Sequence, residues 1–269
     1  MEDHLRIAKI VLLSTLLVFG TSCSKLIEKT LEDNPDILYK VIKKNPGKFM
    51  TTLREAARDA EKSMYEDAQK AEEEQRKKEF DAPKSFSVEA DRPIHGNKDA
   101  QITIVEYSDF QCPFCKKGNE TMEEVAKEYG DKVRFIYKHM PLEQKHPNAR
   151  RGSEYFEAIA LQDAEKAFAF KKAVFDDQNS TYGSDSEAEK FYQKTAKAVK
   201  ADMGKLNADL KSKADFIKKR IEGDMAEAQT NGIEGTPGYL VNGVTLKGAY
   251  PIKDFKMIID EWIKRKNIK

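Results

Sequence analysis

The sequence predicts an α/β fold in which an all-helical lobe interrupts a small sandwich of strands and helices. Apolar, β-branched runs at 102–107 and 133–137 have the composition of buried strands. A long helical region separates these runs from a compact hairpin pattern at 239–246. An amphipathic helical pattern at 252–263 closes the chain. The expected order is therefore strand, helix, strand, helical insertion, hairpin and helix.

Residues 1–22 have the pattern of an export signal. Arg6 and Lys9 precede an apolar run at 10–19 that is too short to span a bilayer as a permanent helix. The run ends in small residues that lead into Cys23, which resembles the lipidation site of bacterial lipoproteins. The resemblance implies a membrane-anchored lipoprotein in a periplasmic or other extracytoplasmic compartment. The alternative is an ordinary secretory signal that leaves Cys23 as an odd free thiol.

The charge balance argues against nucleic acid as a partner. The chain carries 47 Lys and Arg against 46 Asp and Glu, for a formal net charge of +1. A strongly basic chain would be expected for a protein that binds a polyanion.

A helical extension is expected at 24–84, ahead of the main domain. Asn-Pro pairs at 34–35 and 45–46 each have the pattern of an N-cap followed by proline in the first turn. In the second helix, the apolar positions that recur every eleven residues are Phe49, Ala60 and Ala71, together with Leu53 and Met64. This narrow stripe favours a seam between helices, and so a homo-oligomer formed through residues 33–80. A solvated spacer between the domain and a membrane is the alternative.

The motif that carries chemistry is Cys112-Pro113-Phe114-Cys115, between a predicted strand and a helical run. At a helix start, the sulfur of Cys112 would lie beside unpaired backbone N–H groups and the positive end of the helix dipole, which favours the thiolate. Pro113 suits an early helical position because it needs no N–H donor there. We therefore expect Cys112 as the nucleophile and Cys115 as the resolving thiol of a reversible disulfide centre.

Metal binding is a weaker use of the motif. Structural zinc needs four ligands, yet the third cysteine is far upstream, and His139 and His146 show no paired ligand spacing. We expect no metal and no cofactor. His146 is expected to cap or pack at the start of the insertion, and His139 to lie beside a strand end. A purely structural role for a Cys112–Cys115 disulfide is also a weak interpretation, because a disulfide that closes so short a loop would stabilise the fold little.

The chain resembles DsbA-type thiol–disulfide oxidoreductases of the thioredoxin superfamily. The resemblance covers about residues 86–268 and implies a thioredoxin fold with an inserted all-helical lobe at about 146–232. More weakly, the extension resembles the N-terminal helices of some oligomeric members. The matching segments are Val105-Glu106-Tyr107-Ser108-Asp109-Phe110-Gln111 running into the cysteine motif, His146-Pro147-Asn148-Ala149-Arg150, and Gly235-Thr236-Pro237-Gly238-Tyr239-Leu240-Val241-Asn242-Gly243.

The resemblance implies roles for further residues. Pro237 would be a cis-proline that faces the cysteines, and the backbone at Thr236 would pair with an extended substrate segment. Glu106 matches the family's buried acid and would take the proton of Cys115. Asp109 competes for that role, and Lys138 is a candidate partner of Glu106. The alternatives are an ordinary loop at Thr236 and Pro237, and a partly exposed Glu106 without a role.

Phe114 departs from the family's strong oxidants, which carry histidine at this place. Phenylalanine offers neither a hydrogen bond nor a positive charge, so we expect the Cys112 thiolate to be less favoured and the centre less oxidising. Lys116 and Lys117 would compensate in part. The direction therefore stays open between oxidant, isomerase and reductase, and an oligomer would suit an isomerase.

The expected function is an exported oxidoreductase that exchanges disulfides with substrate proteins and is recycled by a redox partner protein. The rival class is a non-enzymatic binding protein. It would be either a holdase for unfolded chains or a carrier that delivers Cu(I) through the two thiolates.

Overall fold

The computed structural model describes residues 27–268, and by its internal contacts the chain divides between Glu72 and Glu73. The predicted export signal and Cys23 lie outside the described residues. Within the described range, no helix combines the length and the apolar character needed to cross a membrane.

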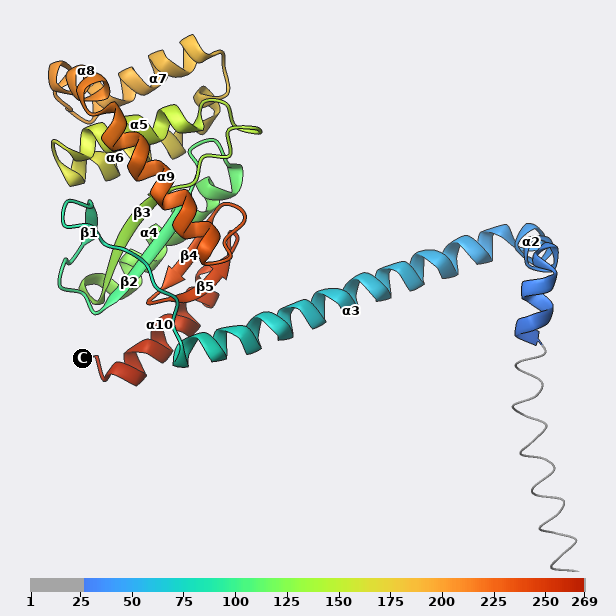
Figure 1. Cartoon of the computed structure of the whole chain (residues 1–269). Coiled ribbons are helices and arrows are strands. Elements are labelled where there is room, and N and C mark those ends of the chain that lie inside the picture. Colours follow the sequence, from blue (N-terminus) through green and yellow to red (C-terminus); the bar gives the residue numbers. More distant parts are fainter. Residues whose placement is uncertain (1–26, 269) are drawn as a thin grey trace, which may run out of the picture. The chain divides into compact units, whose positions relative to one another are not determined.

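The N-terminal helices begin where the sequence predicted. Helix α2 (Pro35–Lys44) and helix α3 (Pro46–Asp81) each start at a proline that follows asparagine (Figure 1). Helix α3 runs unbroken for 36 residues, and its apolar stripe is exposed, with Leu53 at 50% and Met64 at 73% of full exposure. The expected seam is therefore uncovered in a single chain.

The last turns of α3 belong to the packing of the main domain. Glu79 is buried there, and its Oε2 accepts a hydrogen bond of 2.8 Å from the backbone N–H of Thr245. The ring of Phe80 lies 5.2 Å from that of Trp262. The segment from Glu73 onward is thus part of the unit that carries the cysteines.

The main domain contains a five-stranded mixed sheet in the order β1-β3-β2-β4-β5. Strands β2 and β3 are parallel, and every other neighbouring pair is antiparallel. The strands are β1 (Ile94–Gly96), β2 (Ile102–Ser108), β3 (Val133–His139), β4 (Gly238–Val241) and β5 (Val244–Lys247). The sequence missed β1, because three residues are too few to show an alternating pattern.

The predicted hairpin joins β4 to β5 through Asn242 and Gly243. Both residues have positive φ, +47° and +89°, as a two-residue hairpin turn of this kind requires. A β-carbon at Gly243 would also lie 2.5 Å from the backbone oxygen of Lys84, so the turn tolerates no side chain there.

The helical insertion supplies most of the remaining helices. Helix α4 follows β2, and α10 closes the chain; the five long helices between β3 and β4 form the insertion. The bounds are α4 (Pro113–Tyr129), η1 (Gly130–Lys132), α5 (Ala149–Ala160), α6 (Ala164–Asp176), η2 (Gln178–Thr181), α7 (Asp185–Ala198), α8 (Met203–Ser212), α9 (Ala214–Thr230) and α10 (Ile252–Lys266). The helical stretch at 206–230 is divided between α8 and α9, which meet at Lys213, where no Gly or Pro marks the boundary.

The sheet is covered on both faces. Residues from α4 and α10 pack on the face that carries Ile104 and Tyr239, while Ala228 of α9 packs on the opposite face, against Val105. Helices α5 to α8 gather at one end of the sheet (Figure 1). The domain is therefore an α/β thioredoxin fold with an inserted helical lobe, as the sequence predicted.

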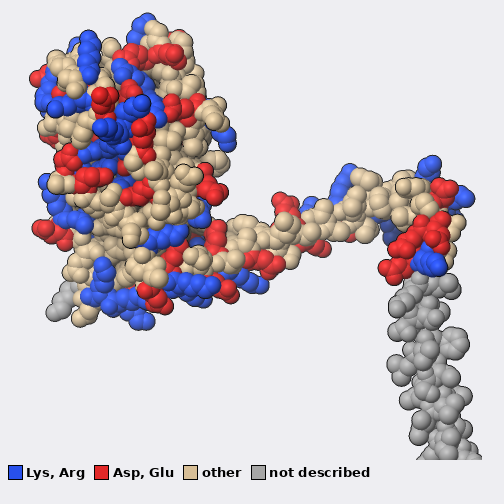
Figure 2. Space-filling model, viewed as in Figure 1, with Lys and Arg blue, Asp and Glu red and all other residues tan. Residues whose placement is uncertain are grey.

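Charges of both signs are interspersed over the visible face of the domain, without a large area of a single sign (Figure 2). This distribution agrees with the balanced composition, 47 basic against 46 acidic residues.

Candidate active site

Cys112 forms the junction between the loop after β2 and the start of α4. It is the N-cap residue of the helix, in an extended conformation, and Pro113 occupies the first helical position. Its carbonyl oxygen accepts the first helical hydrogen bond, 2.9 Å from the backbone nitrogen of Cys115. The sulfur thus lies at the positive end of a 17-residue helix.

Both cysteines are free thiols in this structure, and their environments shift their pKa values in opposite directions. A hydrogen bond from Cys115 lowers the pKa of Cys112 to about 6, against the opposing effect of burial, and Thr236 and backbone N–H groups add to the lowering. Burial raises the pKa of the Cys115 thiol well above its ordinary value, and the neighbouring Cys112 raises it further. Near neutral pH the pair therefore holds one proton, on Cys115.

The loop before β4 faces this pair. The Thr236–Pro237 peptide bond is cis, and the Cys112 sulfur lies 3.4 Å from the carbonyl oxygen of Thr236. The backbone at Thr236 is thus positioned beside the nucleophile.

Asp109 organises the loop that leads to Cys112. Its Oδ1 accepts hydrogen bonds from the backbone N–H groups of Gln111 and Cys112, at 2.7 and 3.1 Å. Its Oδ2 accepts from the N–H of Leu142 at 2.7 Å and lies 2.9 Å from Nδ1 of His146. Both carboxylate oxygens are therefore occupied in shaping the loop, and His146 packs at the start of the insertion as expected.

Glu106 is buried on β2, with 4% of its surface exposed, which excludes the alternative of a partly exposed carboxylate. Its partner is Lys171 of α6, whose Nζ lies 2.7 Å from Glu106 Oε2. Lys138, the candidate partner from the sequence, instead lies 2.5 Å from Glu227. Residues 137 and 138 point to opposite faces of β3, so Lys138 is directed away from Glu106.

No pattern in the sequence predicted a role for Lys171 or Gln178, both in the insertion. Gln178 is buried and donates from Nε2 to the carbonyl oxygens of Phe110 and Cys112, at 3.0 and 2.9 Å. In return, Nε2 of Gln111 donates to the carbonyl oxygen of Thr181 at 2.6 Å. The helical lobe thus binds the backbone of the active-site loop directly. The pair Lys171-Lys172 within the aromatic run 168–175 was the one available signal.

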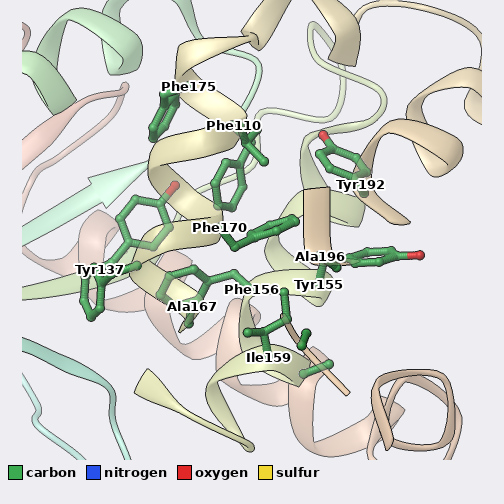
Figure 3. Packing of buried hydrophobic residues seen from close by; sticks show 14 of the residues in the cluster. Phe110, Tyr137, Tyr155, Phe156, Ile159, Ala167, Phe170, Phe175, Tyr192 and Ala196 are labelled. Carbon is green, nitrogen blue, oxygen red and sulfur yellow. The ribbon is translucent and has the colours of Figure 1, made fainter. Parts of the chain in front are cut away.

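Aromatic side chains connect the same loop to the lobe. Phe110 lies between the ring of Tyr137 at 5.4 Å and the ring of Phe175 at 5.5 Å, and it also contacts Phe156 and Phe170 (Figure 3). This cluster continues into the core of the insertion. Four apolar residues of the run 168–175, Phe168, Phe170, Val174 and Phe175, are buried in this core, whereas Ala169 and Lys172 are exposed.

His139 lies at the end of β3, fully buried, with Nε2 2.9 Å from Glu157. It belongs to a buried ionic cluster in which Arg92 binds Asp224 through both terminal nitrogens, at 3.0 and 2.7 Å. The cluster joins α9 to the end of β3, because Asp224 also accepts the backbone N–H of His139.

Phe114 is 65% exposed beside Cys112. The pKa of Cys112 is lowered to about 6, first by the hydrogen bond from Cys115, and Phe114 contributes through its backbone N–H. Among residues 27–268, no group of three His, Cys, Asp or Glu side chains is placed to hold a metal ion.

A mixed sheet in this order, with a dithiol at a helix N-terminus and a helical insertion, defines a protein of the thioredoxin fold with an inserted helical lobe. A family model described as thioredoxin matches residues 87–261, and the chain belongs to this family.

Known proteins resemble the chain over different lengths. The Na(+)/H(+) antiporter NhaA 1 of Mycolicibacterium vanbaalenii is 32% identical over 164 residues, which cover 61% of this chain and 25% of the antiporter. The chain thus spans about a quarter of the length of this curated relative.

Two solved structures share the fold. The thiol-disulfide exchange protein alpha-DsbA2 from Wolbachia pipientis is similar with a TM-score of 0.57 and 19% identity, over 72% of this chain and 96% of that one. Proteus mirabilis ScsC in a transitional conformation is similar with a TM-score of 0.54 and 22% identity, over 91% of this chain and 97% of that one.

Proposed function

We propose that the chain is an exported protein thiol–disulfide oxidoreductase with Cys112 and Cys115 as its redox centre. The observation that carries the proposal is the pair of thiols at the N-terminus of α4, with the Cys112 sulfur 3.4 Å from the Thr236 carbonyl oxygen and Cys115 fully buried three residues later. In this setting the pKa of Cys112 is lowered and that of Cys115 is raised. Thiol exchange needs one sulfur that ionises easily and attacks, and a second that stays protected until a mixed disulfide has formed. Membership of the thioredoxin family supports the same chemistry.

In the oxidising direction, a substrate thiolate attacks the sulfur of Cys112 in the Cys112–Cys115 disulfide. The disulfide breaks, Cys115 leaves as a thiolate that takes up a proton, and Cys112 is joined to the substrate. A second substrate thiolate then attacks the substrate sulfur and expels Cys112. With a pKa of about 6, Cys112 leaves readily as a thiolate at neutral pH. A partner protein removes the two electrons from the reduced pair.

In the isomerising or reducing direction, the reduced Cys112 attacks a disulfide of the substrate. Cys115 must then lose its proton to attack the mixed disulfide, and Glu106 is the base that we assign to this step. The backbone of Thr236 would bind an extended segment of the substrate. The carbonyl oxygen of Thr236 lies 3.4 Å from the Cys112 sulfur, so the bound segment would lie beside the nucleophile.

Two assays test the proposal and its direction. Oxidation of a reduced dithiol peptide measures the forward reaction, and recovery of a scrambled multi-disulfide protein measures isomerisation. We expect Cys112→Ala to abolish both activities. Unchanged activity in both assays for Cys112→Ala would end the enzymatic proposal.

The same variants separate the rival class. A holdase would keep its binding of unfolded chains in Cys112→Ser/Cys115→Ser, and a carrier would bind Cu(I) through the reduced pair and transfer it to a partner. If the unsubstituted protein exchanges no disulfides and one of these two binding results is found, the non-enzymatic binding protein would be the better interpretation.

We further propose that residues 1–22 direct export and that Cys23 is lipidated, which would anchor the chain to a membrane outside the cytoplasm. The support is the apolar run ahead of small residues and Cys23 in the sequence. Metabolic labelling with a fatty acid, compared between the full chain and Cys23→Ser, tests the anchor. Label that persists in Cys23→Ser would exclude it.

A homo-oligomer formed through residues 33–80 is proposed on the exposed stripe of α3. Leu53 and Met64 are 50% and 73% exposed, on a helix with only Glu79 buried among its described residues. Large apolar side chains along one helix are typical of a helix-to-helix interface. An oligomer would present several dithiols together, which suits isomerisation.

A further inference from the structure

The loop that leads into α4 is buried, although it ends at the reactive sulfur. Phe110, Gln111 and Cys112 all belong to the buried part of the domain. Three consecutive backbone carbonyl groups are thereby removed from water, and each needs a hydrogen-bond donor from within the protein. The placement of these donors decides how the loop enters the helix.

All three carbonyl groups accept hydrogen bonds from one short segment of the insertion. Nε2 of Gln178 donates to the carbonyl oxygens of Phe110 and Cys112, at 3.0 and 2.9 Å. The hydroxyl of Tyr182 donates to the carbonyl oxygen of Gln111, which lies between them in the chain. Burial raises the pKa of this hydroxyl, so it keeps the proton that it donates. Two side chains thus bind three carbonyl groups in a row.

The N–H groups of the same loop have a different partner. Oδ1 of Asp109 accepts from the backbone N–H groups of Gln111 and Cys112, at 2.7 and 3.1 Å. The peptide units of the loop are therefore bonded through their N–H groups and through their carbonyl groups. A rotation of either unit would break hydrogen bonds of both kinds.

The segment that supplies the carbonyl donors is itself fixed. Gln178 is buried at the start of the short helix η2, and the hydroxyl of Thr181 donates to its carbonyl oxygen at 2.7 Å. The carbonyl oxygen of Thr181 accepts from the side chains of Gln111 and Asn148, at 2.6 and 3.2 Å. The donors therefore hold a defined position relative to the loop.

The carbonyl group of Cys112 is linked to the environment of its own sulfur. Cys112 is the N-cap residue of α4, with φ −73° and ψ 120°. The backbone N–H groups of Phe114 and Cys115 act to lower its pKa, because they stabilise the thiolate. They face the sulfur only while Cys112 keeps this conformation. The bond from Gln178 to the carbonyl oxygen of Cys112 restrains the angle ψ that sets it.

We propose that Gln178 and Tyr182 are positioning residues for the redox centre, which bind the carbonyl groups of residues 110–112 and so fix the helix start at which Cys112 reacts. We call these two residues the carbonyl-binding pair. The inference rests on the proposed function, since it concerns the nucleophile of that reaction. Neither side chain makes or breaks a bond to the substrate.

A purely structural role for the pair makes a different prediction. If Gln178 and Tyr182 only attached the insertion to the loop, their loss would lower the stability of the fold and leave the chemistry of the sulfur unchanged. Positioning predicts that the acidity of Cys112 and the balance between dithiol and disulfide change as well. These two quantities are therefore the ones to measure.

The experiment compares the reduced full chain with Gln178→Met and Tyr182→Phe. Methionine keeps the length of glutamine without its donors, and phenylalanine removes only the hydroxyl oxygen. The rate of alkylation of Cys112 by iodoacetamide is followed across the titration of the thiol. The ratio of dithiol to disulfide is measured at neutral pH in a series of mixtures of reduced and oxidised glutathione.

Gln178→Met should raise the midpoint of the alkylation titration by roughly one pH unit, the effect of one lost hydrogen bond on a pKa. The thiolate then stabilises the dithiol form less, so the equilibrium with glutathione should shift roughly 3- to 10-fold toward the disulfide. Tyr182→Phe should shift both quantities in the same direction by less, because its partner is the carbonyl group of Gln111, one residue before the nucleophile.

Gln162→Met and Tyr155→Phe are the matched controls. Nε2 of Gln162 also donates to a backbone carbonyl oxygen, that of Asp202 at 3.2 Å, and the hydroxyl of Tyr155 donates to Glu189 at 2.7 Å. Both residues belong to the insertion, and these bonds do not involve the loop at 110–112. The two controls should keep the midpoint and the glutathione equilibrium of the unsubstituted protein. Equal shifts in the controls would overturn positioning in favour of a structural role.

The remaining outcomes separate the two proposals. Midpoints and equilibria that stay unchanged in Gln178→Met and Tyr182→Phe overturn the carbonyl-binding pair and leave the oxidoreductase intact. If Gln178→Met does not fold, Tyr182→Phe decides alone, since Tyr182 is 47% exposed and the variant loses a single oxygen. An unsubstituted protein whose cysteines do not equilibrate with glutathione overturns the oxidoreductase itself.

Discussion

The hydroxyl oxygen of Tyr239 occupies the space in which a side chain at Gly118 would begin. A β-carbon built on Gly118 would lie 2.1 Å from that oxygen and 3.2 Å from Cγ of Pro237. Glycine inside a helix costs about 1 kcal/mol relative to alanine. The active-site helix keeps it because β4 and the loop at Pro237 approach closely at this point.

Gly118→Ala should therefore destabilise the protein despite the better helix propensity of alanine. We expect a loss of about 1–3 kcal/mol in the free energy of unfolding, the usual cost of overpacking, measured with urea. Tyr239→Phe in the same chain removes the clashing oxygen and should restore part of the loss.

Gly223→Ala is the control for this experiment. Position 223 lies within α9, and a β-carbon there would meet no atom within 4 Å. This variant should be more stable than the unsubstituted protein by up to about 1 kcal/mol. A Gly118→Ala protein as stable as Gly223→Ala would contradict the close approach.

The alkylation rate of Cys112 should follow a titration with a midpoint near pH 6. Its pKa is lowered to about 6, first by the hydrogen bond from Cys115, so the reactive thiolate dominates at pH 7 and is lost as pH falls below 6. Iodoacetamide labelling with mass spectrometry measures the rate. Cys115, buried and with a raised pKa, should remain unmodified until urea unfolds the chain. A midpoint near the ordinary cysteine pKa of about 8.5 would refute the shift.

Cys115→Ala should convert the protein into a trap for its substrates. Cys112 can still attack a disulfide, but no resolving thiol follows, so mixed disulfides accumulate. Non-reducing electrophoresis should show adducts that disappear with a reductant. Cys112→Ala/Cys115→Ala is the control. Adducts formed by this variant would mean that the mixed disulfides do not form at the active-site cysteines.

Arg92→Met should be strongly destabilising. Both side chains of the Arg92–Asp224 pair are buried, at 0% and 2% exposure, and removing one partner of such a pair costs about 3–5 kcal/mol. Urea unfolding at several pH values measures the loss.

The loss of unfolding free energy caused by Arg92→Met should become smaller as pH falls. Burial raises the pKa of Asp224 in the folded protein, and loss of the guanidinium raises it further. The folded variant therefore takes up a proton on Asp224 at a higher pH than the unfolded chain does, which relieves the unpaired charge. Arg265→Met, which removes an exposed ion pair with Asp81, is the control and should change stability little. A deficit that is the same at every pH would contradict this account.

Removal of residues 24–72 should convert an oligomer into a monomer without unfolding the domain. The cut precedes Glu79 and Phe80, which pack against β5 and Trp262 and must be retained. Sedimentation of the truncated chain, and of full-length Leu53→Glu/Met64→Glu, gives the mass in solution. An unsubstituted protein that sediments as a monomer would exclude the oligomer.

Much of the fold follows from local patterns in the sequence. The apolar runs of β2 and β3, the Asn242-Gly243 turn and the stripe Phe255, Ile258, Ile259 and Trp262 each have a period or a turn residue that predicts one structure. The helix boundary at Lys213 and the three-residue strand β1 have neither a periodic apolar pattern nor a turn residue in the sequence. The local sequence therefore does not predict them.

The candidate site divides in the same way. The sequence by itself determined the dithiol and its position at a helix start, because both are encoded in one short contiguous motif, whereas the proline that faces the dithiol was expected only from the resemblance to a family. Only the tertiary structure decided that Lys171, 65 residues from Glu106, is its partner and that Gln178 binds the loop at Cys112. The physical reason is that such contacts depend on strand register and on how the insertion docks, which a sequence pattern around either residue cannot specify.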